Sequence, residues 1–145
     1  MIRHRISTAV GLLLLAGCAA TQANASSAGD KAVAHFNAIG AGQVDTIIAG
    51  YTDATVFQWI GGPLDGEYRS KAAIVDLWRK FTGAQGKLDV QVSNVMENAN
   101  PKGTTVTADV KFVGKTTIPV RYVLTYRGDD LVTEIWQIDP KLGQY

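Results

Sequence analysis

Close to Gly86, the hydrophobic period of the chain changes from that of helices to that of strands, and this change limits the folds that the chain can adopt. Before Gly86, apolar residues recur at the spacing of an amphipathic helix, most clearly at Ile74, Leu77, Trp78 and Phe81. After it, apolar and polar residues alternate, as in strands with one buried face. Helices followed by a run of strands predict an α+β domain, in which a curved antiparallel sheet packs over the helices.

Three helices are expected before Gly86. Asp30 is a typical capping residue for the first helix, a short second helix begins near Val44, and Ser70 is the expected cap of the third. The segment 51–60 is rich in Thr, Val, Phe and Trp, and the turn residues Gly61-Gly62-Pro63 follow it. This segment therefore predicts an early strand between the second and third helices.

Four strands are expected after Gly86, with their apolar residues on one face. They cover about 88–93, 105–112, 118–126 and 131–138. Arg127-Gly128-Asp129-Asp130 is predicted to form the last hairpin, so its two acids are interpreted as solvated turn residues.

The N-terminal segment has the pattern of a secretory signal peptide. A basic start at Arg3 and Arg5 precedes an apolar run from Ala9 to Ala20, which is shorter than the roughly 20 residues needed to span a bilayer. Leu15-Ala16-Gly17-Cys18 resembles the lipobox of bacterial lipoproteins, in which the cysteine thiol receives diacylglycerol. We therefore expect a signal peptide at 1–17, a lipid-anchor tether at 18–29 and a folded domain at 30–145.

An ordinary signal peptide, cleaved after Ala23-Asn24-Ala25, is the alternative. Both interpretations predict export, either as a protein lipid-anchored at Cys18 on the periplasmic side of the cell envelope or as a soluble periplasmic or secreted protein. The chain has 14 Lys and Arg against 13 Asp and Glu, without a basic cluster. Nucleic acid is therefore not an expected partner, and membrane attachment would depend on the lipid.

The order of these segments resembles the nuclear transport factor 2-like superfamily, which includes SnoaL-like polyketide cyclases and ketosteroid isomerases. The resemblance rests on Gly42-Gln43-Val44-Asp45, the strand from Tyr51, the helix ending in Trp78-Arg79-Lys80-Phe81, and Glu134-Ile135-Trp136-Gln137. It implies a cone-shaped fold with an apolar pocket between the concave sheet face and the helices. It also implies a possible homodimer through the sheet.

The resemblance places Gln58 where the isomerases have a carboxylate base, His35 near their helix tyrosine and Tyr122 near their late acid. The cyclases often read Glu-His-Trp-Asp at the last strand, where this chain has Ile135 and Gln137. An amide cannot accept a substrate proton as a base. The candidate ligand pocket is therefore His35, Gln58, Tyr122, Ile135 and Gln137, with both inherited routes to proton abstraction replaced.

The favoured function is an exported protein that binds a small, largely apolar ligand or a partner protein without catalysis. One alternative is a cyclase-like or isomerase-like enzyme that uses His35 and Tyr122, although His35 alone is also compatible with a partly buried structural histidine. Another is an envelope assembly module that dimerises through an outward-facing Trp136; the role of Trp59 stays open. No cofactor is expected, and one histidine without cysteine in the mature domain predicts no metal site.

Overall fold

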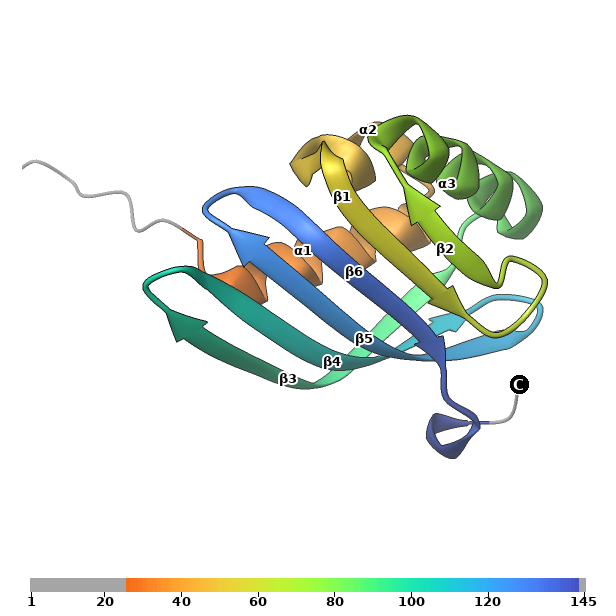
Figure 1. Ribbon diagram of the computed structural model, residues 1–145. Coiled ribbons are helices and arrows are strands. Elements are labelled where there is room, and N and C mark those ends of the chain that lie inside the picture. Colours follow the sequence, from red (N-terminus) through yellow and green to blue (C-terminus); the bar gives the residue numbers. More distant parts are fainter. Residues whose placement is uncertain (1–25, 144–145) are drawn as a thin grey trace, which may run out of the picture.

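The computed structural model describes residues 26–143, in which three α-helices lie against one face of a curved six-stranded sheet (Figure 1). The predicted signal peptide and Cys18 lie outside the described residues. Within 26–143, no helix is long and apolar enough to cross a membrane. The elements are α1 (Ala28–Ala41), α2 (Val44–Ile47), η1 (Ile48–Gly50), β1 (Tyr51–Ile60), β2 (Gly66–Arg69), α3 (Lys71–Gln85), β3 (Asp89–Asn100), β4 (Gly103–Val113), β5 (Thr117–Arg127), β6 (Asp130–Ile138) and η2 (Pro140–Leu142).

The first helix begins earlier than the sequence pattern predicts. Ser27 caps α1 by accepting a hydrogen bond from the backbone N–H of Asp30, and the Asp30 carboxylate accepts one from the N–H of Ser27 in return. This reciprocal capping box places Asp30 inside the first turn, where its charge also favours the helix N-terminus. At the other end, Gly42 takes a left-handed conformation with φ 70°, which glycine adopts without steric cost.

The third helix follows the prediction closely. Ser70 accepts a hydrogen bond from the N–H of Ala73, and the predicted apolar stripe of α3 is buried throughout. Trp78 in the middle of that stripe has no exposed surface. The amphipathic pattern therefore identified both the start of α3 and the face that packs on the sheet.

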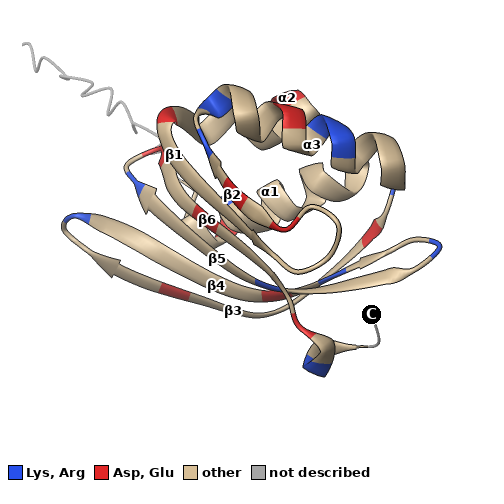
Figure 2. Cartoon of the chain, turned by 45° about the vertical axis from the view of Figure 1, so that its right-hand side comes forward, with Lys and Arg blue, Asp and Glu red and all other residues tan. Residues whose placement is uncertain are grey.

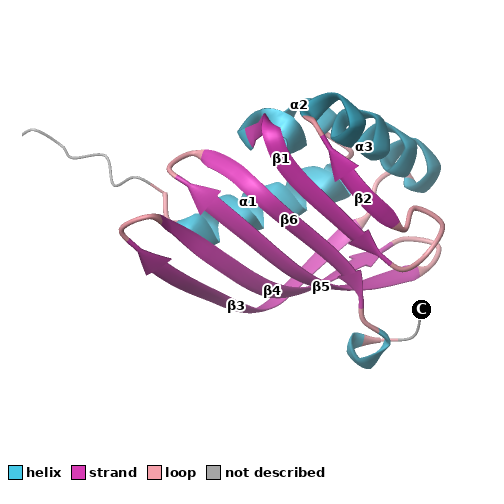
Figure 3. Cartoon of the chain, viewed as in Figure 1, coloured by secondary structure: helices cyan, strands magenta, loops and turns pink. Residues whose placement is uncertain are grey.

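The sheet has the strand order β2-β1-β6-β5-β4-β3, with β1 parallel to β6 and every other neighbouring pair antiparallel. The four late strands and the early strand β1 confirm the predicted α+β class, but the predicted antiparallel sheet is corrected to a mixed one, because β1 pairs in parallel with β6. The edge strand β2 was not predicted, because the polar four-residue segment Gly66–Arg69 is too short to show an alternating pattern. Figure 3 shows the helices on one side of this sheet, and β3 forms its other edge.

The inner face of the sheet forms the core. Residues that alternate along β4 and β5, such as Phe112 and Leu124, are fully buried against the helices. Acidic and basic residues are interspersed over strands and helices in Figure 2.

Candidate functional site

A cluster of hydrogen-bonded polar side chains is buried between α1, α3 and the inner face of the sheet. Glu134 on β6, which has no exposed surface, lies 3.0 Å from Nε2 of His35 on α1 and accepts a hydrogen bond from the hydroxyl of Tyr51 on β1. The indole N–H of Trp78 on α3 donates to the same Tyr51 hydroxyl over 2.9 Å. We call His35, Tyr51 and Glu134, with the Trp78 N–H, the polar cluster.

Each member comes from a different element, and the fold explains why they meet. Tyr51 is the first residue of β1, which runs parallel to β6, so Tyr51 and Glu134 both lie on the inner sheet face. His35 lies one turn before the buried Ile39 on α1 and is 8% exposed. A buried carboxylate needs hydrogen-bond donors around it, and these elements supply them.

Burial and the charge of Glu134 keep Tyr51 of the cluster and the neighbouring Tyr122 protonated. Burial, followed by the charge of Glu134, raises the pKa of Tyr51 well above its ordinary value. The same two causes raise the pKa of Tyr122, whose hydroxyl is buried without a hydrogen-bond partner among the described residues. Glu134 is therefore the acceptor of the cluster, and the phenols remain neutral donors.

A cleft of about 340 Å³ opens beside His35. It lies between α1, the α2–η1 segment and the end of β5 with the start of β6. Its lining residues are Lys31, Ala34, His35, Thr46, Ile47, Ala49, Gly50, Tyr126, Asp129 and Leu131, and we call it the histidine cleft. The polar cluster thus reaches the surface through a single side chain, His35.

A second pocket, of about 310 Å³, lies at the opposite ends of β1 and β6. Its lining residues are Trp59, Pro63, Leu64, Lys80, Phe81, Ala84, Gln85, Ile118 and Ile138, and we call it the apolar pocket. The indole N–H of Trp59 is buried and has no hydrogen-bond partner within residues 26–143. This pocket therefore combines apolar walls with one unused donor on a lining residue.

Stacked aromatic rings separate the cleft from the apolar pocket. Trp136 stacks on Trp59 with ring centroids 4.2 Å apart, and its other contacts include Tyr122 at 5.4 Å. Trp78 likewise lies 5.9 Å from Trp59 and 6.3 Å from His35. We call Trp78 and Trp136 the aromatic wall. Because the wall fills the space beneath the helices, the two hollows share no lining residue.

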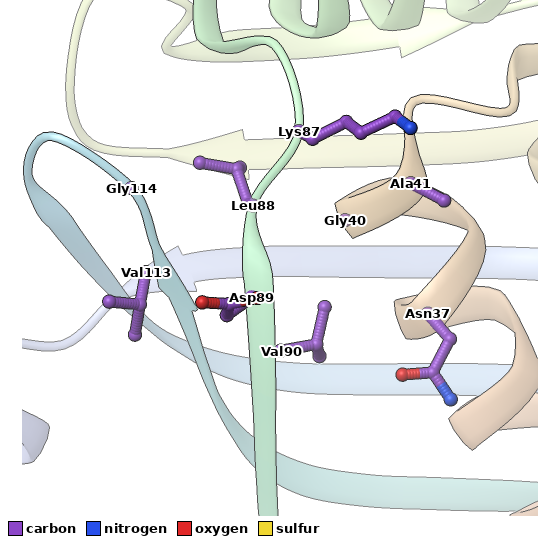
Figure 4. Close-up of a pocket in the computed structure, with 9 residues that line it drawn as sticks. All are labelled: Asn37, Gly40, Ala41, Lys87, Leu88, Asp89, Val90, Val113 and Gly114. Atoms are coloured by element: carbon purple, nitrogen blue, oxygen red, sulfur yellow. The ribbon is translucent and has the colours of Figure 1, made fainter.

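A third hollow lies where the end of α1 meets β3 (Figure 4). At about 490 Å³ it is larger than the other two, but Figure 4 shows Val113 and Asp89 pointing away from Val90 and Asn37. A Cβ at Gly40 would lie 2.2 Å from a Val90 methyl, so the helix and strand already touch there. Its polar groups do not converge, and we assign no chemistry to it.

The structure brings together only two of the five predicted pocket residues. His35 and Tyr122 lie with ring centroids 6.4 Å apart on the inner side of the sheet. Gln58 pairs in register with Ile135, and both lie on the opposite, outer face, where Gln58 contacts Glu67; Gln137 is also exposed there. The predicted pocket of His35, Gln58, Tyr122, Ile135 and Gln137 is therefore corrected.

The error concerns the direction in which β6 faces. The prediction placed the apolar Ile135 inward, which turned Trp136 outward as a dimer contact, but Trp136 and Glu134 are fully buried. Glu134 can face inward because His35 and Tyr51 hydrogen-bond its carboxylate. Sequence reasoning missed Glu134 and Tyr51; the alternation of Glu134 with Trp136 was the available signal.

Metal-binding geometry is not found in the described part of the chain. Within 26–143, no group of three or more His, Cys, Asp or Glu side chains could hold a metal ion.

The comparisons with known proteins agree with this fold. The SnoaL-like domain family model matches residues 32–135, and the chain belongs to this family. A search of the curated proteins finds no match.

Solved structures share this architecture at low sequence identity. One is a nuclear transport factor 2-like protein of unknown function from Pseudomonas putida, with a TM-score of 0.65, 17% identity, and coverage of 74% of this chain and 80% of that one. An epoxide hydrolase of M. tuberculosis has a TM-score of 0.57 and 15% identity, and the match covers 77% of this chain and 82% of that one. The orange carotenoid protein of Anabaena, solved with canthaxanthin, has a TM-score of 0.63 and 14% identity, and the match covers 78% of this chain and 37% of that one. At these identities the likeness shows the fold alone.

Proposed function

We propose that this domain binds a small, largely apolar molecule in the apolar pocket, without catalysing a reaction there. The observation that carries the proposal is a pocket lined by Leu64, Phe81 and Ile138 together with Trp59, whose buried indole N–H has no partner within residues 26–143. A buried donor without a partner costs free energy that a ligand acceptor atom would recover. The ligand is therefore an apolar molecule with one acceptor, such as a ketone oxygen.

The size and lining of the pocket support a ligand of modest size. Its volume of about 310 Å³ is near the lower end of the range of small-molecule sites, which combine apolar walls with few polar groups. The orange carotenoid protein, 37% of whose chain matches this fold, binds the apolar molecule canthaxanthin. We infer the same class of chemistry here.

The arrangement of acids and bases supports binding without turnover. Lys80 is the only lining residue of the apolar pocket with a titratable side chain. His35 and Glu134 lie on the other side of the aromatic wall, so neither reaches a ligand in this pocket. A general base must lie within hydrogen-bond reach of the proton that it removes.

A pair of tryptophan substitutions tests the binding proposal. Acetophenone offers an apolar ring with one carbonyl acceptor, and ethylbenzene is its counterpart without an acceptor. Titration calorimetry should show tighter binding of acetophenone, and Trp59→Phe should weaken it about 3-fold to 10-fold, which corresponds to one hydrogen bond of about 0.5–1.5 kcal/mol.

The matched control is Trp136→Phe. Its indole N–H is also buried without a partner within 26–143, but Trp136 does not line the pocket. Acetophenone affinity should be unchanged in this control. Equal loss in both variants, or no preference of acetophenone over ethylbenzene, would contradict the proposal.

We also propose that the protein is exported and held in the cell envelope by lipid on Cys18. The support is the lipobox-like Leu15-Ala16-Gly17-Cys18 at the end of a basic and then apolar leader. Cys18→Ala should move the protein from the membrane fraction to the soluble envelope fraction, or block its processing. An unchanged membrane fraction would overturn the lipid anchor.

A further inference from the structure

The histidine cleft is crossed by two acid–base pairs that connect α1 to the β5–β6 region. At the rim, Nζ of Lys31 lies 2.6 Å from a carboxylate oxygen of Asp129; at the floor, Nε2 of His35 lies 3.0 Å from Glu134. Lys31 and His35 are four residues apart, so they share one face of the helix. The side chain of Asp129 is 96% exposed, whereas Glu134 is fully buried.

Glu134 fixes how His35 presents its ring to the cleft. The carboxylate accepts from Tyr51, and its other oxygen faces Nε2 of His35, so that nitrogen carries the proton. The second ring nitrogen, Nδ1, is left for a molecule in the cleft. When Nδ1 is also protonated, it becomes a donor, and Glu134 balances the positive charge of the ring.

Two further donors line the same cleft. Lys31 contributes its ammonium group at the rim, and Tyr126 contributes a phenol on the wall. Burial, followed by the charge of Glu134, raises the pKa of Tyr126 above its ordinary value, so its hydroxyl stays protonated. Between these donors lie the apolar side chains of Ala34, Ile47 and Leu131.

We propose that the histidine cleft binds a small organic monocarboxylate with a short apolar body, with its headgroup held by Lys31, Tyr126 and His35. The apolar body packs on Ile47 and Leu131. This site is separate from the apolar pocket, because the aromatic wall lies between them and no lining residue is shared.

Asp129 is the group that a bound carboxylate replaces. Its ion pair with Lys31 is exposed, and exposed pairs contribute little, so the ammonium group can exchange one carboxylate for another. Removing the negative charge of Asp129 frees Lys31 and so strengthens binding. A site for an ammonium ligand predicts the opposite response.

The charged and titratable groups around the cleft come from several of the elements packed against His35. His35 faces Lys31 on its own helix, Tyr51 from β1, Tyr122 and Tyr126 from β5, Asp129 from the hairpin and Glu134 from β6. The α2–η1 segment contributes no titratable side chain to the lining.

The experiment compares butyrate, butylammonium and 1-butanol on the full chain by titration calorimetry at pH 7. Butyrate should bind most tightly, at least 5-fold more tightly than 1-butanol. Preference for butylammonium, or equal affinity for butyrate and 1-butanol, overturns the proposal.

Three substitutions outside the buried cluster locate the bound butyrate. Lys31→Met should weaken binding at least 5-fold, and Asp129→Asn should strengthen it several-fold. Lys80→Met removes the lysine of the apolar pocket and should leave the affinity for butyrate unchanged. The proposal is overturned if butyrate binding is lost in Lys80→Met, is normal in Lys31→Met, or is unchanged or weaker in Asp129→Asn. None of these outcomes affects the result of the acetophenone test.

Discussion

The two ends of the inner sheet face differ in whether their buried polar groups have hydrogen-bond partners. Near the start of β1 and β6, the polar cluster joins His35, Tyr51 and Glu134 through hydrogen bonds that converge on one carboxylate. Near their ends, Trp59 and Trp136 stack 4.2 Å apart, and neither indole N–H has a partner within the described residues. One end is a closed hydrogen-bond network, and the other is an aromatic stack with unused donors.

This difference shows where each end can accept a ligand. Removing any donor from a buried carboxylate strongly destabilises the protein, because the charge is left without a partner. The polar cluster can therefore contact a ligand only through the side of His35 that lines the cleft. A stack of apolar rings imposes no such requirement, and the apolar pocket can hold a molecule directly against Trp59. The aromatic wall allows both environments to exist on one sheet face.

The largest effect is expected at Trp78, because this residue belongs to both ends. Its N–H donates to Tyr51, and its ring stacks on Phe57 with centroids 5.5 Å apart. Trp78→Ala should lower the free energy of unfolding by about 3–5 kcal/mol, the usual cost of deleting a large buried aromatic side chain. Chemical denaturation measures this change in the free energy of unfolding. A loss of less than about 1 kcal/mol, which is typical of exposed positions, would show that the aromatic wall is not tightly packed.

A matched pair of Tyr→Phe substitutions separates bonded from unbonded phenols. Tyr51→Phe removes the donor to Glu134 and the acceptor for Trp78, and should cost about 1–3 kcal/mol of unfolding free energy. Tyr122→Phe removes a buried hydroxyl that has no partner within 26–143, and should be neutral or stabilising. Equal losses in the two variants would mean that Tyr122 also donates to the cluster.

The fold was largely predictable because its signals are local. The stripe on α3, the Ser70 cap and the alternation along β4 and β5 each reflect one element and its buried face. The missed strand β2 depends on pairing with β1 across a turn, and its four residues carry no period. The start of α1 was misplaced by one turn because Ser27 and Asp30 are both good capping types.

The candidate site was less predictable because it depends on pairing between distant elements. His35 and Tyr122 were singled out and do lie close together, but the predicted outward direction of Trp136 implied the same direction for Glu134, two residues before it, and both are buried. A lone glutamate in a strand normally faces water, and its burial here becomes favourable because two distant side chains, His35 and the unforeseen Tyr51, hydrogen-bond its carboxylate. Gln58 was placed by family position, and its register on β1 turns it outward.

Alkaline pH should test the electrostatics around Glu134. The pKa values of Tyr51, Tyr122 and Tyr126 are raised in the folded protein above the ordinary value of 10.0, so the unfolded chain loses these protons first. Stability is therefore fully present below pH 10 and falls as pH rises above it, by up to about 1.4 kcal/mol per pH unit for each tyrosine.

Denaturation curves at pH 9, 10 and 11 measure this fall, and Tyr122→Phe isolates one contribution. Because phenylalanine cannot ionise, the variant should lose less stability than the wild type between pH 10 and 11. Parallel curves for the two proteins would mean that Tyr122 ionises as readily in the folded state as in the unfolded chain.

The smallest effect is expected at the rim of the histidine cleft, where Lys31 meets Asp129. The hydrogen bond from Lys31, followed by its positive charge, lowers the pKa of Asp129 below 3.8. Because the pKa of Asp129 is lowered, the contribution of this ion pair to the stability of the fold is present above pH 3.8 and is lost as pH falls. The contribution is small, since solvent screens so exposed a pair. Asp129→Asn should therefore leave the denaturation midpoint at pH 7 unchanged within error. A clear loss at pH 7 that disappears near pH 3 would show that the rim pair, like the buried pair of His35 and Glu134, holds α1 on the sheet.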